Sequence, residues 1–225
     1  MKNFVIAIDG PAGAGKSTVA KIVAEKLGFL YVDTGAMYRA LTLKAMKKNI
    51  DFRNKEELIK MAENTDLKLY QDTKYRVILD GEDVSEEIRK EEVSKNTHFV
   101  ASIFEIREIL WEMQRSFRET SNIVMEGRDI GSKVFPDAQL KIYLDASVEE
   151  RAKRRYLQLK EKGEIADIEE IKKEVIERDK KDRNRKIAPL VKLPDAVYID
   201  TTNLTIEEVV ERIINLYHQK LNSSG

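Results

Sequence analysis

A glycine-rich segment near the N-terminus limits what this chain can fold into more than any other feature. It follows the apolar run Phe4–Ile8 and opens a stretch, 16–27, whose apolar positions have helical spacing. The segment consists of Gly10, Pro11, Ala12, Gly13, Ala14, Gly15, Lys16, Ser17 and Thr18. A strand, a turn of the form G-x-x-x-x-G-K-[ST] and a helix, in this order, are typical of a P-loop. The pattern therefore predicts an α/β fold with a strand that leads directly into this loop.

The residue types of this loop suit the binding of phosphate groups. Glycines let successive backbone N–H groups converge on one point, and the following helix adds roughly half a positive charge there. Lys16 supplies a cation for the β- and γ-phosphates, and the Ser17 hydroxyl can ligate Mg²⁺. A plain β–α turn would need neither Lys16 nor Ser17 in this register. The loop therefore predicts a nucleoside triphosphate site with Mg²⁺.

Strand and helix patterns alternate along most of the chain. Further short apolar runs predict strands at 29–32, 123–125, 140–144 and 196–199. Apolar residues at helical spacing predict helices at 36–48, 56–62, 99–118, 148–162, 168–185 and 206–221. Such alternation favours a three-layer α/β fold, in which a parallel sheet has helices on both faces.

Residues 64–97 break the alternation. Two alternating runs, 66–70 and 75–79, are separated by 71–74, and the tight-turn dipeptide Asp80-Gly81 follows them. These features are typical of an antiparallel hairpin. We therefore expect a P-loop core formed by 1–63 and 98–225, with an inserted antiparallel subdomain at 64–97. The last three residues, 223–225, are expected to be a frayed tail.

Composition excludes several classes of protein. The 225 residues contain 40 basic and 40 acidic side chains and no cysteine. Without cysteine there is no disulfide framework, thiolate zinc site or cysteine nucleophile, and a formal charge of zero argues against wholesale capture by nucleic acid or membrane. The apolar runs are far shorter than the roughly 20 residues of a membrane helix, and the first residues do not resemble a cleavable signal. We expect an intracellular enzyme or a nucleotide-switched protein.

A P-loop alone does not distinguish a GTPase, a motor ATPase and a small-molecule kinase. A guanine-specific GTPase usually shows N-K-x-D, but the nearest stretch, 54–57, lacks the aspartate. Glu126 and Asp145 each follow a predicted strand and are candidates for an acid near the metal, although neither pattern is strong. The choice of class therefore depends on other residues.

Several arginines follow predicted strands or lie on predicted helices, where they could bind a second anion besides the triphosphate. Arg39 follows the second strand, Arg128 follows the 123–125 strand, and one predicted helix carries Arg151, Arg154 and Arg155. The 168–185 helix has one stripe composed of Ile168, Ile171, Val175, Arg178, Asp182 and Arg185. Charged groups on an inward face are costly unless they are paired or bind a ligand. We favour a substrate clamp, while an internal Arg178–Asp182 ion pair with a solvated helix end is the structural alternative.

Several other polar residues have a structural and a functional interpretation. Asp129 and Asp182 could position a ribose or base, or could simply pair with nearby arginines. Asp33 and Thr34 begin a strand-to-helix turn at the sheet edge where α/β proteins bind ligands, but Thr34 could equally be a helix N-cap. The two histidines have no partner spacing for a metal site.

Five stretches of this sequence closely resemble the bacterial cytidylate kinase family. They are 10–18, 33–39, 81–84, 126–131 and 178–185. The resemblance covers nearly the whole chain and implies the nucleoside monophosphate kinase fold, with five parallel strands, an antiparallel insert and a mobile lid at about 150–166. It implies transfer of the ATP γ-phosphoryl group to CMP or dCMP with Mg²⁺, by a cytoplasmic monomer that acts on neither nucleic acid nor membranes.

The resemblance also assigns residues to tasks. It gives the CMP phosphate to Arg39, Arg128 and Arg185, the ribose to Arg178 and Asp182, and the cytosine edge to Arg107 and Asp129. The CMP region would also include Asp33, Thr34, Tyr38 and His98. Phosphoryl transfer would depend on Lys16, Arg128 and Arg185 and on the lid arginines Arg151, Arg154 and Arg155. This chain departs from the family pattern at His98, where a serine is common, and at Glu126, where an aspartate is frequent.

Two alternatives remain open. Another P-loop kinase, for example of the shikimate type, could use the same loop and lid, but would not need the hairpin insert or the 178–185 face. An RNA-associated ATPase is favoured by the block 172–186, which has eight basic and four acidic residues. Against it, that block has no aromatic residues on which bases could stack.

Overall fold

The computed structural model describes residues 2–71, 74–161 and 163–222, and the chain divides into two compact units. The first unit comprises Met1–Tyr31 and Ser121–Gly225, and the second comprises Val32–Thr120. The predicted insertion, 64–97, lies inside the second unit, which extends well beyond it on both sides. The predicted tail, 223–225, lies outside the described residues, as do 72–73 of the hairpin and position 162 of a predicted helix.

A five-stranded sheet has the order β2-β6-β1-β7-β8. Its strands are β1 (Val5–Asp9), β2 (Leu30–Asp33), β6 (Ile123–Gly127), β7 (Leu140–Asp145) and β8 (Val197–Asp200). β1 pairs in parallel with both β6 and β7, and β7 pairs in parallel with β8. Every residue of β1 is buried, as expected for a strand covered on both faces. The predicted parallel sheet is therefore confirmed, and the carboxyl end of β1 lies between those of β6 and β7.

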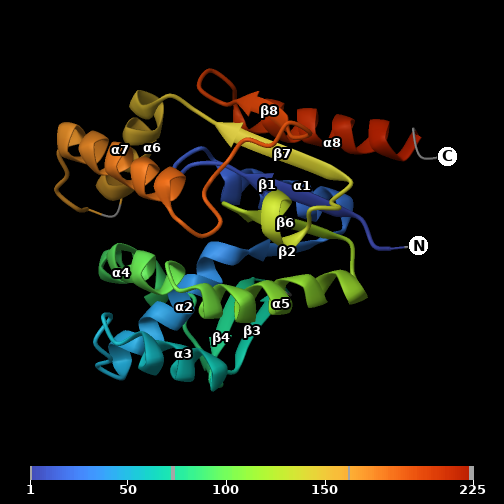
Figure 1. The fold of residues 1–225 in the computed structure, drawn as a ribbon. Helices are drawn as coiled ribbons and strands as arrows, with labels where there is room; N and C mark the ends of the chain where they lie inside the picture. The colour runs from blue at the N-terminus through green and yellow to red at the C-terminus, as the bar shows by residue number, and fades with distance from the viewer. Residues whose placement is uncertain (1, 72–73, 162, 223–225) are drawn as a thin grey trace. The chain divides into compact units, whose positions relative to one another are not determined.

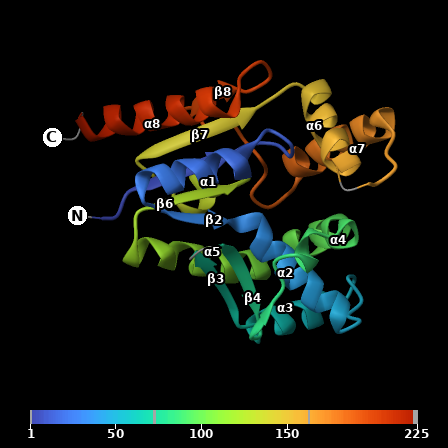
Figure 2. The same ribbon diagram turned by 180° about the vertical axis from the view of Figure 1, so that it is seen from behind.

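Helices of the first unit flank this sheet or lie beyond the carboxyl end of β7, as Figures 1 and 2 show. They are α1 (Lys16–Leu27), α6 (Val148–Glu161), α7 (Ile168–Asn184) and α8 (Ile206–Asn222). Contacts join α1 to β1, β6 and α8, whereas α6 and α7 pack against each other. Their bounds lie within one or two residues of the predicted ones because each apolar face is long and periodic.

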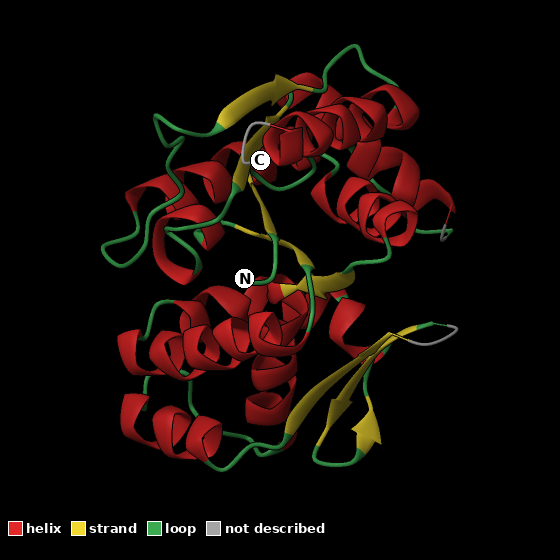
Figure 3. Cartoon of the chain, turned by 90° about the vertical axis from the view of Figure 1, so that its right-hand side faces the viewer, coloured by secondary structure: helices red, strands yellow, loops and turns green. Residues whose placement is uncertain are grey.

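The second unit combines helices with a three-stranded sheet of order β3-β4-β5, whose strands are yellow in Figure 3. Its elements are α2 (Thr34–Lys47), α3 (Lys55–Glu63), β3 (Leu67–Gln71), β4 (Tyr75–Leu79), β5 (Glu82–Asp83), α4 (Glu91–Ala101) and α5 (Phe104–Thr120). Both strand pairs are antiparallel, as predicted. Asp80 and Gly81 form the turn before β5 with φ of 50° and 89°, the left-handed geometry that this dipeptide favours. No helix in the described ranges of either unit is long and apolar enough to span a bilayer.

The prediction of a single helix at 99–118 is wrong, because one helix, α4, ends at Ala101 and a second, α5, begins at Phe104. The Ser102 hydroxyl donates to the carbonyl of Phe99 over 2.7 Å, and Arg107 Nε donates to the carbonyl of Ala101 over 2.7 Å. These side chains satisfy the last carbonyls of α4, which a helix end leaves without partners. Buried Val100, Ile103 and Ile106 keep helical spacing across the break, so the apolar pattern gave no sign of it.

Candidate active site

The P-loop connects β1 to α1 in the first unit, at the carboxyl edge of the sheet. Gly10 passes so close to β7 that a Cβ there would lie 1.9 Å from the carbonyl oxygen of Leu144. Lys16 is buried, and its Nζ donates to the carbonyl of Pro11 over 2.8 Å. The loop is therefore curled around the lysine, as the motif predicts.

The Lys16 amine lies in a strongly charged environment. Burial lowers its pKa to about 7, and the charge of Arg128 acts in the same direction, while Glu126 and Asp182 act against it. A buried cation among guanidiniums is poorly stabilised until an anion arrives. A bound polyphosphate would therefore restore the proton and the charge of Lys16.

Ser17 and Glu126 form a pair of adjacent oxygen donors. The Ser17 hydroxyl donates to Glu126 Oε1 over 2.5 Å, and Glu126 is buried at the end of β6. The other candidate acid, Asp145, accepts instead from the backbone N–H of Ala146 over 2.9 Å. In the parts of the chain that the structure describes, no group of three or more His, Cys, Asp or Glu side chains could hold a metal ion. One hydroxyl and one carboxylate suit Mg²⁺, which usually takes its other ligands from phosphates and water.

Arg128 and Asp182 are joined directly. Arg128 Nε donates to Asp182 Oδ2 over 2.8 Å, which links the end of β6 to α7. Burial raises the pKa of Asp182, but the charges of Arg128, Arg178 and Arg185 outweigh it and hold this pKa below its ordinary value. The structure thus brings together four of the predicted acceptor-site residues with Lys16 in one electrostatic cluster.

The stripe predicted on the 168–185 helix needs correction. On α7 the buried positions are Ile171 and Asp179, whereas Ile168 is 43% exposed and Arg178 is exposed. The buried face follows i, i+4 spacing from Ile171 through half-buried Val175 to Asp179, so it departs from the predicted stripe at Arg178. A buried aspartate is tolerated here because an arginine on α6 compensates its charge.

That compensating side chain is Arg151, which the family resemblance assigned to the lid. It is 2% exposed, and its guanidinium makes a two-pronged ion pair with Asp179, with N–O distances of 3.0 and 2.6 Å. It also donates to the carbonyls of Ala146 and Ala12, over 2.9 and 3.1 Å. Arg151 therefore ties α6 to α7 and to the P-loop backbone. Arg155 lies half-buried on the same helix.

Arg185 caps the end of α7. Its Nε lies 2.9 Å from the carbonyl oxygen of Ile187 and 3.2 Å from that of Ala188, and its Nη2 also donates to Ala188. The guanidinium is therefore oriented by the backbone that follows the helix. Such preorganisation reduces the entropy lost when an arginine binds an anion.

In the second unit, Asp33 organises the start of α2. Its Oδ1 accepts from the backbone N–H of Ala36 and its Oδ2 accepts from Arg39 Nη2, both over 2.9 Å. The N-cap is therefore Asp33, and the alternative that Thr34 caps the helix is wrong; Thr34 is the buried first residue of α2. Because Asp33 both caps the helix and holds Arg39, a single carboxylate fixes the direction of this arginine.

Arg107 and Tyr38 also meet in the second unit. Arg107 is 1% exposed, its Nη1 donates to the Tyr38 hydroxyl over 3.3 Å, and its guanidinium carbon lies 5.2 Å from the centre of the Tyr38 ring. His98 is exposed on α4, and its Nδ1 lies 2.8 Å from the carbonyl oxygen of Lys95. The structure therefore brings Arg107 and Tyr38 together, and the contact of His98 is local.

Sequence reasoning missed two polar residues at strand ends, Asp9 and Thr201. Asp9 accepts from the backbone N–H groups of Ile130 and Gly131, over 2.9 and 2.8 Å, and so holds the turn that follows Arg128 and Asp129. Burial raises the pKa of Asp9 to about 6. Thr201 follows β8 and is 3% exposed. Their positions at the carboxyl ends of parallel strands, where such sheets bind ligands, are the signal that could have found both. Asp179 is a third omission.

The sequence is similar to known proteins over nearly its whole length. The family model described as cytidylate kinase matches residues 6–219. A cytidylate kinase from Alkaliphilus oremlandii (strain OhILAs) is 55% identical over 216 residues, which cover 96% of this chain and 98% of the relative. One from Caldanaerobacter subterraneus subsp. tengcongensis is 55% identical over 208 residues, 92% of each chain. Among solved structures, an uncharacterized protein from Eubacterium ventriosum ATCC 27560 has a TM-score of 0.53 at 14% identity, over 97% of this chain and 99% of that one. The last comparison concerns the fold alone.

Proposed function

The chain belongs to the cytidylate kinase family, and we propose that it transfers the γ-phosphoryl group of ATP to CMP or dCMP, giving CDP or dCDP and ADP. The observation that carries this proposal is the cluster of Lys16, Arg128, Arg178, Asp182 and Arg185 beside the P-loop. A triphosphate alone would not need so many guanidiniums next to the lysine. Identity of 55% over nearly the whole chain supports the same conclusion.

The donor end of the site would use the backbone amides of 10–18 together with Lys16. Helix α1 begins at Lys16, so its N-terminus points positive charge at the bound phosphates. Lys16, with a pKa of about 7 before binding, would become fully charged beside the phosphate oxygens. This change couples ATP binding to uptake of a proton near neutral pH.

Mg²⁺ fits the pair formed by Ser17 and Glu126. Both supply hard oxygen donors within one hydrogen bond of each other, and ATP would supply further oxygens. The ion would neutralise negative charge on the phosphates. Glu126 in place of the frequent aspartate keeps the carboxylate and lengthens its reach.

The acceptor end would bind CMP through residues assigned by the family resemblance. The resemblance assigns the CMP phosphate to Arg39, Arg128 and Arg185, the ribose to Arg178 and Asp182, and the base to Asp129 and Arg107. Asp33, Thr34, Tyr38 and His98 would complete the CMP region. Cytosine has an amino donor for a carboxylate and acceptors for a guanidinium, so an Asp and an Arg match its edge.

The reaction would be a direct in-line transfer without a covalent enzyme intermediate. The acceptor phosphate oxygen is already anionic near neutral pH, so no general base is needed. Catalysis would then consist of positioning and of stabilising the charge on the transferred group by Lys16, Arg154 and Arg155. The enzyme would act on small-molecule nucleotides, as a monomer in the cytoplasm.

A coupled ADP-release assay tests this function. ATP·Mg is offered with CMP, dCMP, UMP, AMP or shikimate, and we expect rapid turnover with CMP and dCMP. Lys16→Ala and Arg185→Ala should each lower kcat by about 100-fold or more, with unchanged circular dichroism as the control for folding. Turnover with shikimate instead of CMP would favour another P-loop kinase, and tight, salt-dependent RNA binding without turnover would favour an RNA-associated ATPase.

A further inference from the structure

Three consecutive carbonyl groups of the P-loop are held from outside the loop. The carbonyl of Ala12 accepts from Arg151 over 3.1 Å, and that of Gly13 lies 3.4 Å from Arg154 Nη1. The carbonyl oxygen of Ala14 lies 3.2 Å from the hydroxyl of Thr201. In a trans peptide the C=O and the following N–H point in opposite directions. Holding these carbonyls outward therefore turns the next three N–H groups the other way, toward a bound phosphate.

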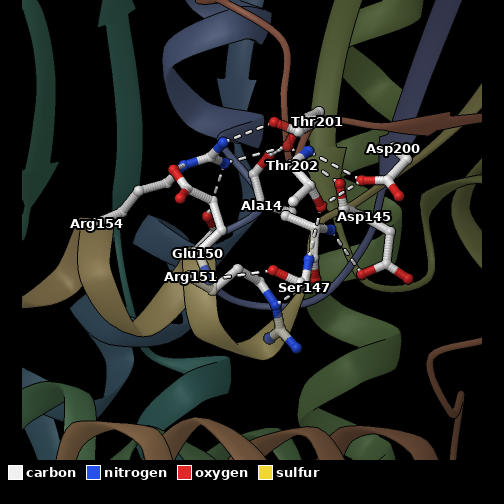
Figure 4. Close-up of polar contacts among 11 residues, drawn as sticks. Ala14, Asp145, Ser147, Glu150, Arg151, Arg154, Asp200, Thr201 and Thr202 are labelled. Atoms are coloured by element: carbon white, nitrogen blue, oxygen red, sulfur yellow. Dashed lines mark hydrogen bonds and ion pairs between the residues drawn. The ribbon is translucent and has the colours of Figure 1, made fainter. Parts of the chain in front are cut away.

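Thr201 contacts both the P-loop and the arginine that lies against it, as Figure 4 shows. Its backbone N–H donates to the carbonyl of Asp145 over 2.8 Å, and its hydroxyl lies 3.1 Å from the same oxygen. Arg154 reaches it twice: Nη1 donates to the hydroxyl over 3.1 Å and Nη2 donates to the Thr201 carbonyl over 2.8 Å. Glu150 holds the other side of this guanidinium, 3.0 Å from Arg154 Nε. Thr201 thus connects β7, α6 and the P-loop through one side chain.

We propose that Thr201 is a positioning residue for the phosphoryl donor. This proposal rests on the proposed kinase function. The Thr201 hydroxyl can donate to a carbonyl and accept from a guanidinium at the same time. Its single proton is shared between the carbonyl oxygens of Ala14 and Asp145. The hydroxyl thus holds the peptide between Ala14 and Gly15 while it accepts from Arg154. Thr201 acts through these groups and not by touching the reacting atoms.

The valine variant isolates the hydroxyl. Thr201→Val keeps the β-branched shape of a side chain that is 3% exposed, but removes the donor and acceptor. Ala14 and Arg154 lose this partner, and the loop amides lose part of their alignment. The KM for ATP should rise and kcat should fall, because the hydroxyl contacts the loop that would bind the phosphoryl donor. The KM for CMP should stay within about twofold of the wild-type value, since the Thr201 side chain bonds to the P-loop, β7 and α6 and not to Arg128 or Asp182.

Two further variants complete the design. Thr201→Ser keeps the hydroxyl and should restore most of the activity. Thr202→Val is the matched control in the same turn: the Thr202 hydroxyl donates to Asp200 over 2.5 Å and accepts from the backbone N–H of Ser147 over 2.9 Å. The Thr202→Val variant therefore lacks one hydroxyl of this turn, while Thr201 keeps its hydrogen bonds to Ala14 and Arg154.

We expect Thr201→Val to lower kcat/KM for ATP by about 10-fold or more, the effect of one lost hydrogen bond to a charged group. Thr201→Ser should remain within about threefold of wild type, and Thr202→Val should match wild type. Wild-type ATP kinetics for Thr201→Val, or equal losses in Thr201→Val and Thr202→Val, would overturn the proposal. Thr201→Ala takes the place of the valine variant if the latter does not fold.

Calorimetric titration with ATP·Mg separates this proposal from the proposed function. If the wild type fails to phosphorylate CMP, the function is wrong, yet ATP affinity still tests Thr201. A roughly 10-fold weaker ATP affinity in Thr201→Val, with wild-type affinity in Thr201→Ser, supports the positioning role. Equal ATP affinities in all three proteins contradict it.

Discussion

Each arginine that the family resemblance assigns to the CMP phosphate is held in position by other groups of the protein. Arg39 is held by Asp33, Arg128 by Asp182 and Arg185 by the carbonyls that follow α7. A guanidinium held in this way keeps further N–H donors with which it could bind an anion. The conformational entropy of these long side chains is therefore lost during folding and not when an anion binds.

Gly35 gives a test of this preorganisation. A Cβ at position 35 would lie 2.9 Å from Arg39 Nη1 and 3.1 Å from Asp33 Oδ1. Gly35→Ala should push the guanidinium of Arg39 off its carboxylate, although alanine is a better helix residue than glycine. We expect the KM for CMP to rise about 10-fold, the loss of one charged hydrogen bond, with the KM for ATP unchanged in steady-state assays.

A double-mutant cycle provides the control for this prediction. Arg39→Ala should raise the KM for CMP at least as much, and adding Gly35→Ala to it should have no further effect. Additive effects of the two substitutions would mean that Gly35 does not act through Arg39. The midpoint of thermal unfolding should change little in Gly35→Ala.

The sequence predicted site residues only where a local pattern carries the information. Lys16 and Ser17 follow from the loop motif, and the family resemblance supplied roles for the arginines, which stay predictions. Arg151 pairs with Asp179, 28 positions away, and Thr201 meets Ala14, 187 positions away. No spacing rule reaches such distances, because these pairs exist only once the sheet has formed.

At the scale of elements, α6 and α7 are fastened by one buried ion pair. The side chains of Arg151 and Asp179 are 2% and 10% exposed, and their closest N–O distance is 2.6 Å. Breaking such a pair leaves one uncompensated buried charge, which costs far more than the pair itself contributes. The attachment of the predicted lid therefore depends on this contact.

Asp179→Ala should lower the free energy of unfolding by about 3–5 kcal/mol, measured by urea denaturation. The double variant Arg151→Met/Asp179→Leu should lose much less, because it removes both charges. Glu177→Ala is the matched control on α7: Glu177 pairs with Lys181 over 3.3 Å at the surface, and its loss should cost no more than about 1 kcal/mol. A similar loss in Asp179→Ala and Glu177→Ala would contradict the importance of the buried pair.

Elements were predictable wherever the apolar period was long and ended at a clear signal. The strands of the parallel sheet and the hairpin at β3 and β4 followed from such patterns. The break at Ser102 did not, because side-chain hydrogen bonds end α4 while the apolar period continues into α5. Periodicity reports which face is buried, but not where the backbone bonds stop.

At the scale of the whole molecule, one buried carboxyl links stability to pH. Burial raises the pKa of Asp9 to about 6, from an ordinary value near 3.8. The folded protein therefore takes up this proton more readily than the unfolded chain. The contribution of Asp9 to the free energy of unfolding is most favourable below about pH 4, falls as the pH rises to 6, and then stays low.

Asp9→Asn should remove this dependence. As the pH rises from 4 to 6.5, the unfolding free energy of the wild type should fall relative to that of Asp9→Asn by roughly 2 kcal/mol. Urea titrations of both proteins at several pH values measure the difference. A difference that stays constant with pH would show that Asp9 does not titrate in this range.

The strand order also sets a sequence of events during synthesis. β1 is made first, but its neighbours in the sheet, β6 and β7, begin at residues 123 and 140. The nascent chain must therefore release all of 32–120 before its first strand can find either neighbour. That intervening stretch is continuous and has its own helices and sheet. On the ribosome, all of the second unit is therefore synthesised before the first unit has its complete sheet.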